Sequence, residues 1–182
     1  MANNYRILLK NPEFQVEAAS LKAELNENLQ LDLQSLRLLN VYDLFGFTPE
    51  LLEKSRYSVF GEIVTDKVSD ECDLTGTRYI AVEYLPGQFD QRAASAVDCV
   101  HLIDPKADVR IKSSKLIILS GDTGDATIAK IKHYYINAVE SRKKDLSKLT
   151  DAESAAVKPV PVLDGFTKMT DADLEPFCRK MG

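Results

Sequence analysis

A short turn holds the residues whose types could do chemistry, namely Gln88, Asp90, Gln91 and Arg92. Pro86-Gly87 forms the turn, and the hydrophobic spacing that follows predicts a helix from about residue 90 to residue 103. At the N-terminus of that helix the two side-chain amides could hydrogen-bond to a polar ligand, and Arg92 could pair with a carboxylate or a phosphate. Asp90 could equally cap the helix while the other side chains lie in water. The residues alone leave both interpretations open.

No complete catalytic set accompanies this turn. His101 and His133 are the only histidines, and neither has a partner at the spacing of a metal-ligand pair. Gly121-Asp122-Thr123-Gly124 lacks the Gly-Lys-Ser/Thr of a phosphate loop and favours a capped turn into a helix. Cys99 lies on the predicted helix, and we expect a small buried residue there. We therefore predict neither a catalytic residue nor a metal site.

The composition is that of a soluble folded protein. The 182 residues are 45% hydrophobic and 28% charged, with a net charge of -5. This acidic balance argues against a nucleic-acid partner, which requires a basic face. The best basic run, Arg142-Lys143-Lys144, is followed at once by Asp145, so we expect a solvated end of a helix or strand there.

Cysteine usage and hydropathy indicate the compartment. The three cysteines form no CxxC pair, and the N-terminus lacks the pattern of a secretion signal. No apolar run approaches the ~18 residues of a membrane helix. The sequence thus predicts a cytoplasmic protein with no membrane contact.

The hydrophobic pattern divides the first part of the chain into five elements. They are a strand at 5–9, a helix at 16–29, a strand at 36–42, a helix opened by Thr48 and Pro49, and a strand at 62–68. Thr48 suits the N-cap, and Pro49 suits the first helical position, where a missing N–H costs nothing.

The second part repeats this order, with strands at 79–84, 109–119 and 138–142 and helices at 90–103 and after the turn at 121–125. The offsets are nearly constant: Tyr5 to Tyr79 is 79 - 5 = 74, Phe14 to Phe89 is 89 - 14 = 75, and Val64 to Val139 is 139 - 64 = 75. Either copy alone would leave an apolar face in water. We therefore expect two pseudo-symmetric β-α-β-α-β repeats packed as one α+β domain.

The amino-acid pattern of the chain changes after Arg142, where the repeat of strands and helices ends. Val157-Lys158-Pro159-Val160-Pro161-Val162 has alternating prolines, which is typical of an extended linker. Thr170 suits the N-cap of a short helix that meets Pro176. The predicted division is a first repeat at 1–75, a second repeat at 76–146, and a linker with a helical stub at 147–182. Such an ending is typical of a connection to a further domain.

The run Pro86-Gly87-Gln88-Phe89-Asp90-Gln91-Arg92-Ala93-Ala94-Ser95 resembles a segment near the N-terminus of single-chain phosphoribosylformylglycinamidine synthases, which work in purine biosynthesis. Residues 36–45, 64–66 and 137–142 resemble the same region, and the resemblance covers essentially the whole chain in order. The family usually has Pro where this chain has Ala138.

The resemblance implies an N-terminal domain similar to a fused dimer of the small PurS-type subunit. The whole enzyme is a ligase that uses ATP, magnesium and glutamine to convert formylglycinamide ribonucleotide into the amidine. None of the family's ATP ligands or glutaminase residues can be placed on this chain. The implied role is therefore non-catalytic and without a cofactor. The domain would bridge the synthetase core and the glutaminase domain of the same polypeptide. It would also help to form the substrate cleft and shield ammonia from water. The turn at 88–92 would lie nearest the substrate.

A stand-alone regulatory module is the alternative. Tandem α+β repeats of this size can bind a small metabolite between the copies. This alternative does not account for the proline-rich stretch and the short helix after Arg142.

Overall fold

The computed structural model describes residues 3–10, 15–121, 123–149, 151 and 166–181. The chain divides into two units, Met1–Ala152 and Glu153–Gly182. The predicted proline linker at 157–162 lies outside the described residues. No helix within the described ranges is long and apolar enough to cross a membrane.

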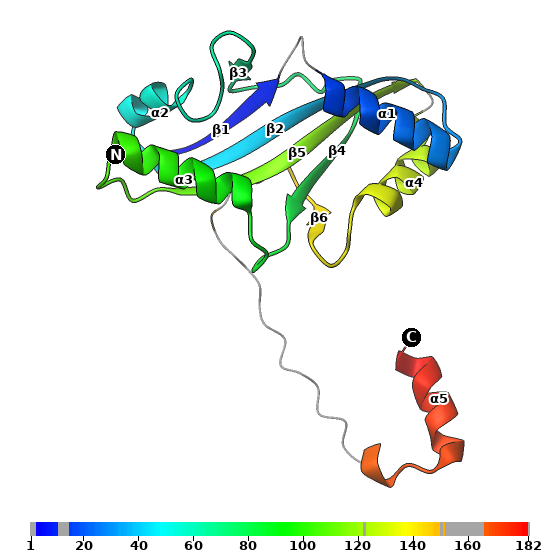
Figure 1. Cartoon of the computed structure of the whole chain (residues 1–182). Coiled ribbons are helices and arrows are strands. Elements are labelled where there is room, and N and C mark those ends of the chain that lie inside the picture. Colours follow the sequence, from blue (N-terminus) through cyan, green and yellow to red (C-terminus); the bar gives the residue numbers. More distant parts are fainter. Residues whose placement is uncertain (1–2, 11–14, 122, 150, 152–165, 182) are drawn as a thin grey trace. The chain divides into compact units, whose positions relative to one another are not determined.

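The larger unit is a mixed α+β structure built on one antiparallel sheet, which confirms the predicted class (Figure 1). The strands are β1 (Asn3–Lys10), β2 (Leu33–Phe47), β3 (Lys67–Ser69), β4 (Arg78–Tyr84), β5 (Arg110–Gly121) and β6 (Ser141–Lys143). Their order across the sheet is β3-β1-β2-β5-β4-β6, and each neighbouring pair is antiparallel.

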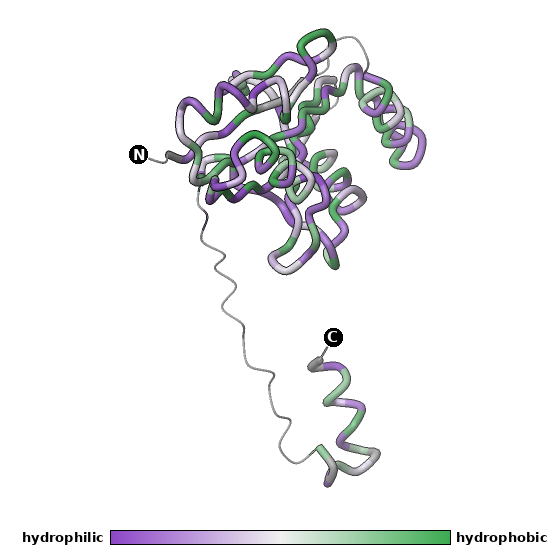
Figure 2. The backbone as a smooth tube through the Cα atoms, turned by 60° about the vertical axis from the view of Figure 1, so that its left-hand side comes forward, coloured by the Kyte–Doolittle hydropathy of each residue, from purple (hydrophilic) through white to green (hydrophobic). Residues whose placement is uncertain are grey.

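Four helices cover one face of this sheet: α1 (Val16–Leu29), α2 (Pro49–Ser55), α3 (Gln91–Ile103) and α4 (Asp125–Tyr135). Their amphipathic pattern is visible where hydrophilic and hydrophobic segments alternate along the tube (Figure 2). Side chains two residues apart on a strand share a face. On β2, Leu36 packs with residues of α1 and α4, while Tyr42 and Leu44 pack with residues of α2 and α3. The helices therefore bury the even-numbered side of β2 in two clusters.

The other face of the sheet carries a smaller apolar cluster. It consists of Leu39, Val41, Ala81, Leu116 and Ile118. Cys72 and Leu74, from the loop before β4, and Leu146, which follows β6, pack against it. Among the described residues, those that pack against this cluster from outside the sheet belong to loop segments.

Two predicted strands are much shorter than expected. The run at 62–68 forms a strand only at β3, because Glu62 and Asp66 close a turn: the Asp66 N–H donates to the Glu62 carbonyl (2.8 Å), and the Glu62 N–H donates to Asp66 Oδ2 (2.9 Å). Ile63 and Val64 are consequently 79% and 91% exposed. The run at 138–142 likewise begins with a turn, and pairing starts at Ser141.

Local capping follows the sequence, whereas two burial predictions were wrong. Thr48 caps α2 by accepting a hydrogen bond from the Leu51 N–H (3.2 Å). Cys99 is exposed and not buried, because α3 turns Ala93, Ala96 and Val100 toward the sheet. Lys144, expected in a solvated charge run, is only 5% exposed.

The smaller unit contains a 3-10 turn, η1 (Phe166–Lys168), and α5 (Asp171–Met181). Its helix begins where the Thr170 N–H and hydroxyl both donate to Asp173 Oδ2, at 3.0 and 2.7 Å. Pro176 lies inside the helix, which continues past it. The rings of Phe166 and Phe177 lie 5.5 Å apart.

Candidate functional site

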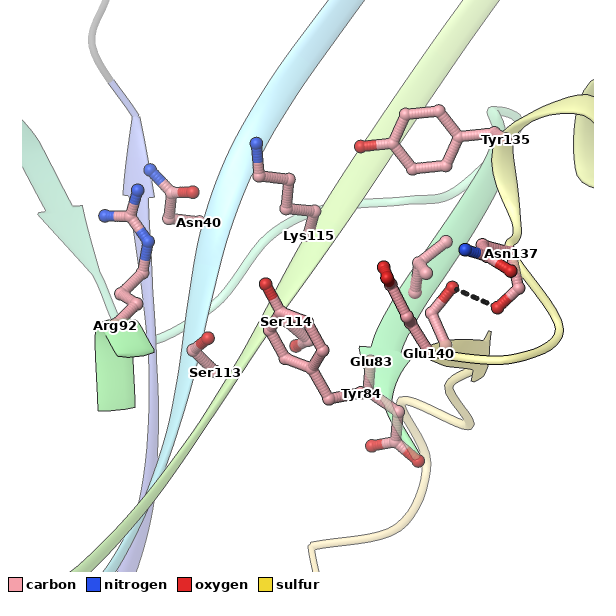
Figure 3. A pocket seen from close by; sticks show the side chains of 12 residues that line it. Asn40, Glu83, Tyr84, Arg92, Ser113, Ser114, Lys115, Tyr135, Asn137 and Glu140 are labelled. Atoms are coloured by element: carbon pink, nitrogen blue, oxygen red, sulfur yellow. Dashed lines mark hydrogen bonds between the residues drawn. The ribbon is translucent and has the colours of Figure 1, made fainter. Parts of the chain in front are cut away.

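The first turn of α3 borders a cavity of about 290 Å³. Its walls come from β2, β4, β5, the start of α3, the end of α4 and the turn before β6 (Figure 3). The polar and aromatic residues that matter most for its chemistry are Asn40, Tyr84, Arg92, Lys115, Tyr135 and Glu140. The cavity therefore lies where the middle of the sheet meets two helix ends.

Arg92 is the one residue of the predicted turn that lines this cavity. Its guanidinium donates a 3.4 Å hydrogen bond to the Tyr42 hydroxyl. This bond raises the pKa of Arg92 further above its usual value, and the nearby carboxylates of Glu17 and Asp90 act in the same direction. The guanidinium thus stays charged and retains donors for an anionic ligand.

Asp90 has a structural role in the walls of the cavity. Its Oδ1 accepts hydrogen bonds from the Ala93 N–H (2.9 Å) and the Ser113 hydroxyl (2.8 Å), and its Oδ2 accepts one from the Ser113 N–H (2.8 Å). The carboxylate therefore caps α3 and ties it to β5. These three bonds direct Asp90 toward the protein and not toward a ligand.

The two glutamines of the turn lie outside the lining of the cavity. Gln88 donates from Nε2 to the carbonyl of Val139 (3.1 Å), which joins the turn before α3 to the turn before β6. Gln91 is exposed, and its side chain makes no hydrogen bond within the part of the chain that the structure describes. Of the four predicted residues, the structure places Arg92 in the cavity and uses Asp90 and Gln88 to hold its walls.

Asn40 and Lys115 were missed by the sequence reasoning. They face each other in the central β2–β5 ladder, on the side that the helices cover. Lys115 pairs with Glu17 of α1, and the Oδ1 of Asn40 is buried without a hydrogen-bond partner among the described residues. Only Asn40 had a local signal, since it lies between the apolar residues Leu39 and Val41, where a polar group needs a hydrogen-bonding reason.

Tyr135 and Glu140 complete the opposite wall. Figure 3 shows the Tyr135 hydroxyl pointing toward Lys115. Burial raises the pKa of this phenol, so it remains a neutral donor and acceptor. The Glu140 carboxylate has no side-chain partner in the described ranges. The lining thus includes two cations, Arg92 and Lys115, and two carboxylates, Glu83 and Glu140, as a site for a polar molecule with both kinds of group would.

Two arrangements that catalytic sites often use can be checked against the described residues. Within the described residues, no group of histidine, cysteine and carboxylate side chains is gathered as a metal site would need. Among the side chains that line the cavity, no serine or tyrosine hydroxyl lies beside a histidine as an activated nucleophile would.

No family model matches this chain, and no match was found among curated proteins or among solved structures.

Proposed function

We propose that this chain is the non-catalytic N-terminal domain of an ATP- and glutamine-dependent phosphoribosylformylglycinamidine synthase. It would bridge the synthetase core and the glutaminase domain and help to form the substrate cleft and the ammonia path. ATP and magnesium would bind to the synthetase core. The proposal extends the resemblance carried by residues 86–95.

The observation that carries the proposal is the strand order. When β1, β2 and β3 are matched with β4, β5 and β6, the order β3-β1-β2-β5-β4-β6 reads the same from both edges of the sheet. The elements between the strands match as well, since α1 and α3 follow the first strand of each half, and α2 and α4 follow the second. A fused pair of small PurS-like subunits joined through their second strands would have this order.

The strand register supports the same matching. Ile7 lies opposite Tyr42, and Ile80 lies opposite Ile117. All four belong to the two clusters under the helices. The offsets are 80 - 7 = 73 and 117 - 42 = 75, close to the separations that the sequence predicts.

One predicted match needs a shift by one residue. Tyr5 packs in the same cluster as Ile7, on the helix-covered face. Tyr79 is adjacent to Ile80 and therefore points to the other face, because neighbours on a strand alternate. The partner of Tyr5 in the second half is thus Arg78 and not Tyr79.

The mass and activity of the native polypeptide test the proposal. An antibody raised against this chain should detect a single band far above 20.3 kDa in extracts of the source cells. The immunopurified polypeptide should convert formylglycinamide ribonucleotide into the amidine with ATP, magnesium and glutamine. A native band at 20.3 kDa, or a larger polypeptide without this activity, would refute the assignment.

The contribution of the α3 turn can be tested in the full enzyme. Arg92→Ala should raise the apparent KM for the ribonucleotide by about tenfold, because a charged hydrogen-bond donor would be lost. Gln91→Ala is the matched control, since this neighbour lies outside the cavity lining. An unchanged KM in a folded Arg92→Ala enzyme would remove the turn from the substrate site.

A second candidate is a stand-alone regulatory module, favoured by the position of the cavity beside Asn40 and Lys115, where the two halves of the sheet meet. Its ligand would stabilise the folded state by mass action, by about 2.7 kcal/mol at 100 times the Kd. A screen of small metabolites for an increase in Tm tests this function. A native band at 20.3 kDa would favour it over the synthase domain.

A further inference from the structure

We propose a second binding site, for the dianionic phosphate of a small phosphomonoester, on the face of the sheet that the helices leave uncovered. The site is a polar cavity of about 330 Å³ beside β6 and the segment that follows it. The side chains that carry the argument are Asp43, Glu83, Lys112, Arg142 and Lys144, which all line it. The inference is independent of the proposed function.

Strand alternation places these groups on one face. Asp43 lies between Tyr42 and Leu44, whose side chains pack under the helices, so its carboxylate points to the opposite side. Lys112 lies opposite Asp43 in the ladder, and Arg142 lies opposite Glu83. Arg142 is exposed and Lys112 is partly exposed, whereas Asp43 and Lys144 are buried.

A chain of ion pairs uses up both carboxylates. Lys144 Nζ lies 2.7 Å from Asp43 Oδ2 and 3.0 Å from Glu83 Oε2. The other oxygens are also taken, since Arg6 Nε lies 2.6 Å from Asp43 Oδ1 and Arg142 Nε lies 2.9 Å from Glu83 Oε1. Two carboxylates are therefore shared among three cations.

Lys112 adds a further positive charge. Its ammonium donates to the carbonyl of Asp151 at 3.3 Å and lies 5.9 Å from the ring centre of Phe45. It makes no ion pair with any carboxylate within the described residues. The lining as a whole holds five cations against three carboxylates, a balance of 5 - 3 = +2: Lys112, Arg142, Lys143, Lys144 and Lys148 against Asp43, Glu83 and Asp145. Lys148 and Asp145, which also line the cavity, pair with each other at 3.5 Å.

A phosphate dianion matches this balance in sign and in size of charge. Lysine and arginine are the usual phosphate donors, and cations in a recess with low-dielectric walls concentrate anions. The volume leaves room for a phosphate with a small organic group, because one water in the liquid occupies about 30 Å³. A nucleic-acid backbone fits less well, since it requires an extended basic face, whereas the whole chain has a net charge of -5.

The test is a titration of the 182-residue chain with inorganic phosphate at constant ionic strength, followed through backbone amide NMR shifts. We expect saturable shifts in β6 and in the segment after it. Lys112→Gln and Arg142→Gln should each raise the Kd by about tenfold, because each removes a charged donor. Lys130→Gln, on the exposed side of α4, is the matched control and should leave the Kd unchanged.

Circular dichroism verifies that each variant is folded. If either Lys112→Gln or Arg142→Gln fails to fold, the other variant still tests the site. Shifts that do not saturate, or that stay the same in both site variants, would overturn the proposal. Binding of a short single-stranded oligonucleotide without binding of phosphate would also overturn it, and would indicate a nucleic-acid surface.

Discussion

Replacing Lys144 by methionine tests whether the buried ion pairs stabilise the sheet. The Lys144 side chain is 5% exposed, and those of Asp43 and Glu83 are 4% and 19% exposed. Methionine has nearly the length of lysine and would fill the same space without a charge. The substitution therefore leaves two carboxylates short of one shared cation and creates little cavity.

The expected loss follows from the remaining partners. Breaking a buried ion pair by removing one partner costs roughly 3–5 kcal/mol, because a charge stays buried without compensation. Arg6 still holds Asp43, and Arg142 still holds Glu83, so we expect the low end of this range, about 3 kcal/mol. For a unit of this size, 1 kcal/mol corresponds to about 2–4 °C, which gives a Tm lower by about 6–12 °C.

Thermal and urea unfolding followed by circular dichroism measure this loss. Lys143→Met is the matched control, because Lys143 is exposed and makes no ion pair within the described residues. We expect it to change stability by less than about 0.5 kcal/mol. If the two variants unfold within 1–2 °C of each other, the cost of desolvating Lys144 offsets its attraction to both carboxylates, and the reasoning fails.

Three further predictions concern stability and pH. Asp90→Ala removes three hydrogen bonds and should lower the free energy of unfolding, measured in urea, by about 2 kcal/mol. Asp98→Ala, on the exposed side of α3, is the control and should lower it by less than about 0.5 kcal/mol. Equal losses would contradict the structural role of Asp90. Gly46→Ala should cost more than Gly87→Ala: both have positive φ, +80 and +86, but a Cβ at Gly46 would lie 2.3 Å from a backbone carbonyl oxygen, while Gly87 has nothing within 4 Å. The Gly87 variant should lose about 1–2 kcal/mol of stability, because alanine is strained at positive φ. If the Gly46 variant loses no more than this, the backbone around the added Cβ relaxes and the predicted clash is wrong. Burial raises the pKa of Tyr135 above the 10.0 of an exposed phenol. The contribution of Tyr135 to stability is therefore complete below about pH 10 and is lost as the pH rises through the folded pKa. Tyr135→Phe should flatten this part of the stability profile in unfolding experiments between about pH 9 and pH 11.

Local signals predicted most of the elements. Thr48 was predicted as an N-cap, and capping by Asp90 was one of the two interpretations left open, because a cap bonds to an N–H only three residues away. The apolar spacing located α1 and α3 for the same reason, since it reports on one helix face. The turn at 62–66 was missed because its β-branched residues favour a strand, whereas the bonds between Glu62 and Asp66 close the chain first.

The cavities were beyond such signals, because their residues meet only through pairing across the sheet. Asn40 and Lys115 lie opposite each other although no local pattern links them. Lys144 was expected in water, since its own neighbours are charged. Its two carboxylate partners come from β2 and β4, and no local reading of the charge run could supply them.

The central β2–β5 ladder also has a consequence for how the chain reaches its structure. Its partners are far apart in sequence, as in the pair Asn40 and Lys115, where 115 - 40 = 75. Such contacts close a long loop before they add stability, so they form slowly. During synthesis, β2 emerges well before β5, with apolar side chains on both of its faces. We therefore expect folding to wait until the second half has left the ribosome, and a half-made chain to require protection by a chaperone.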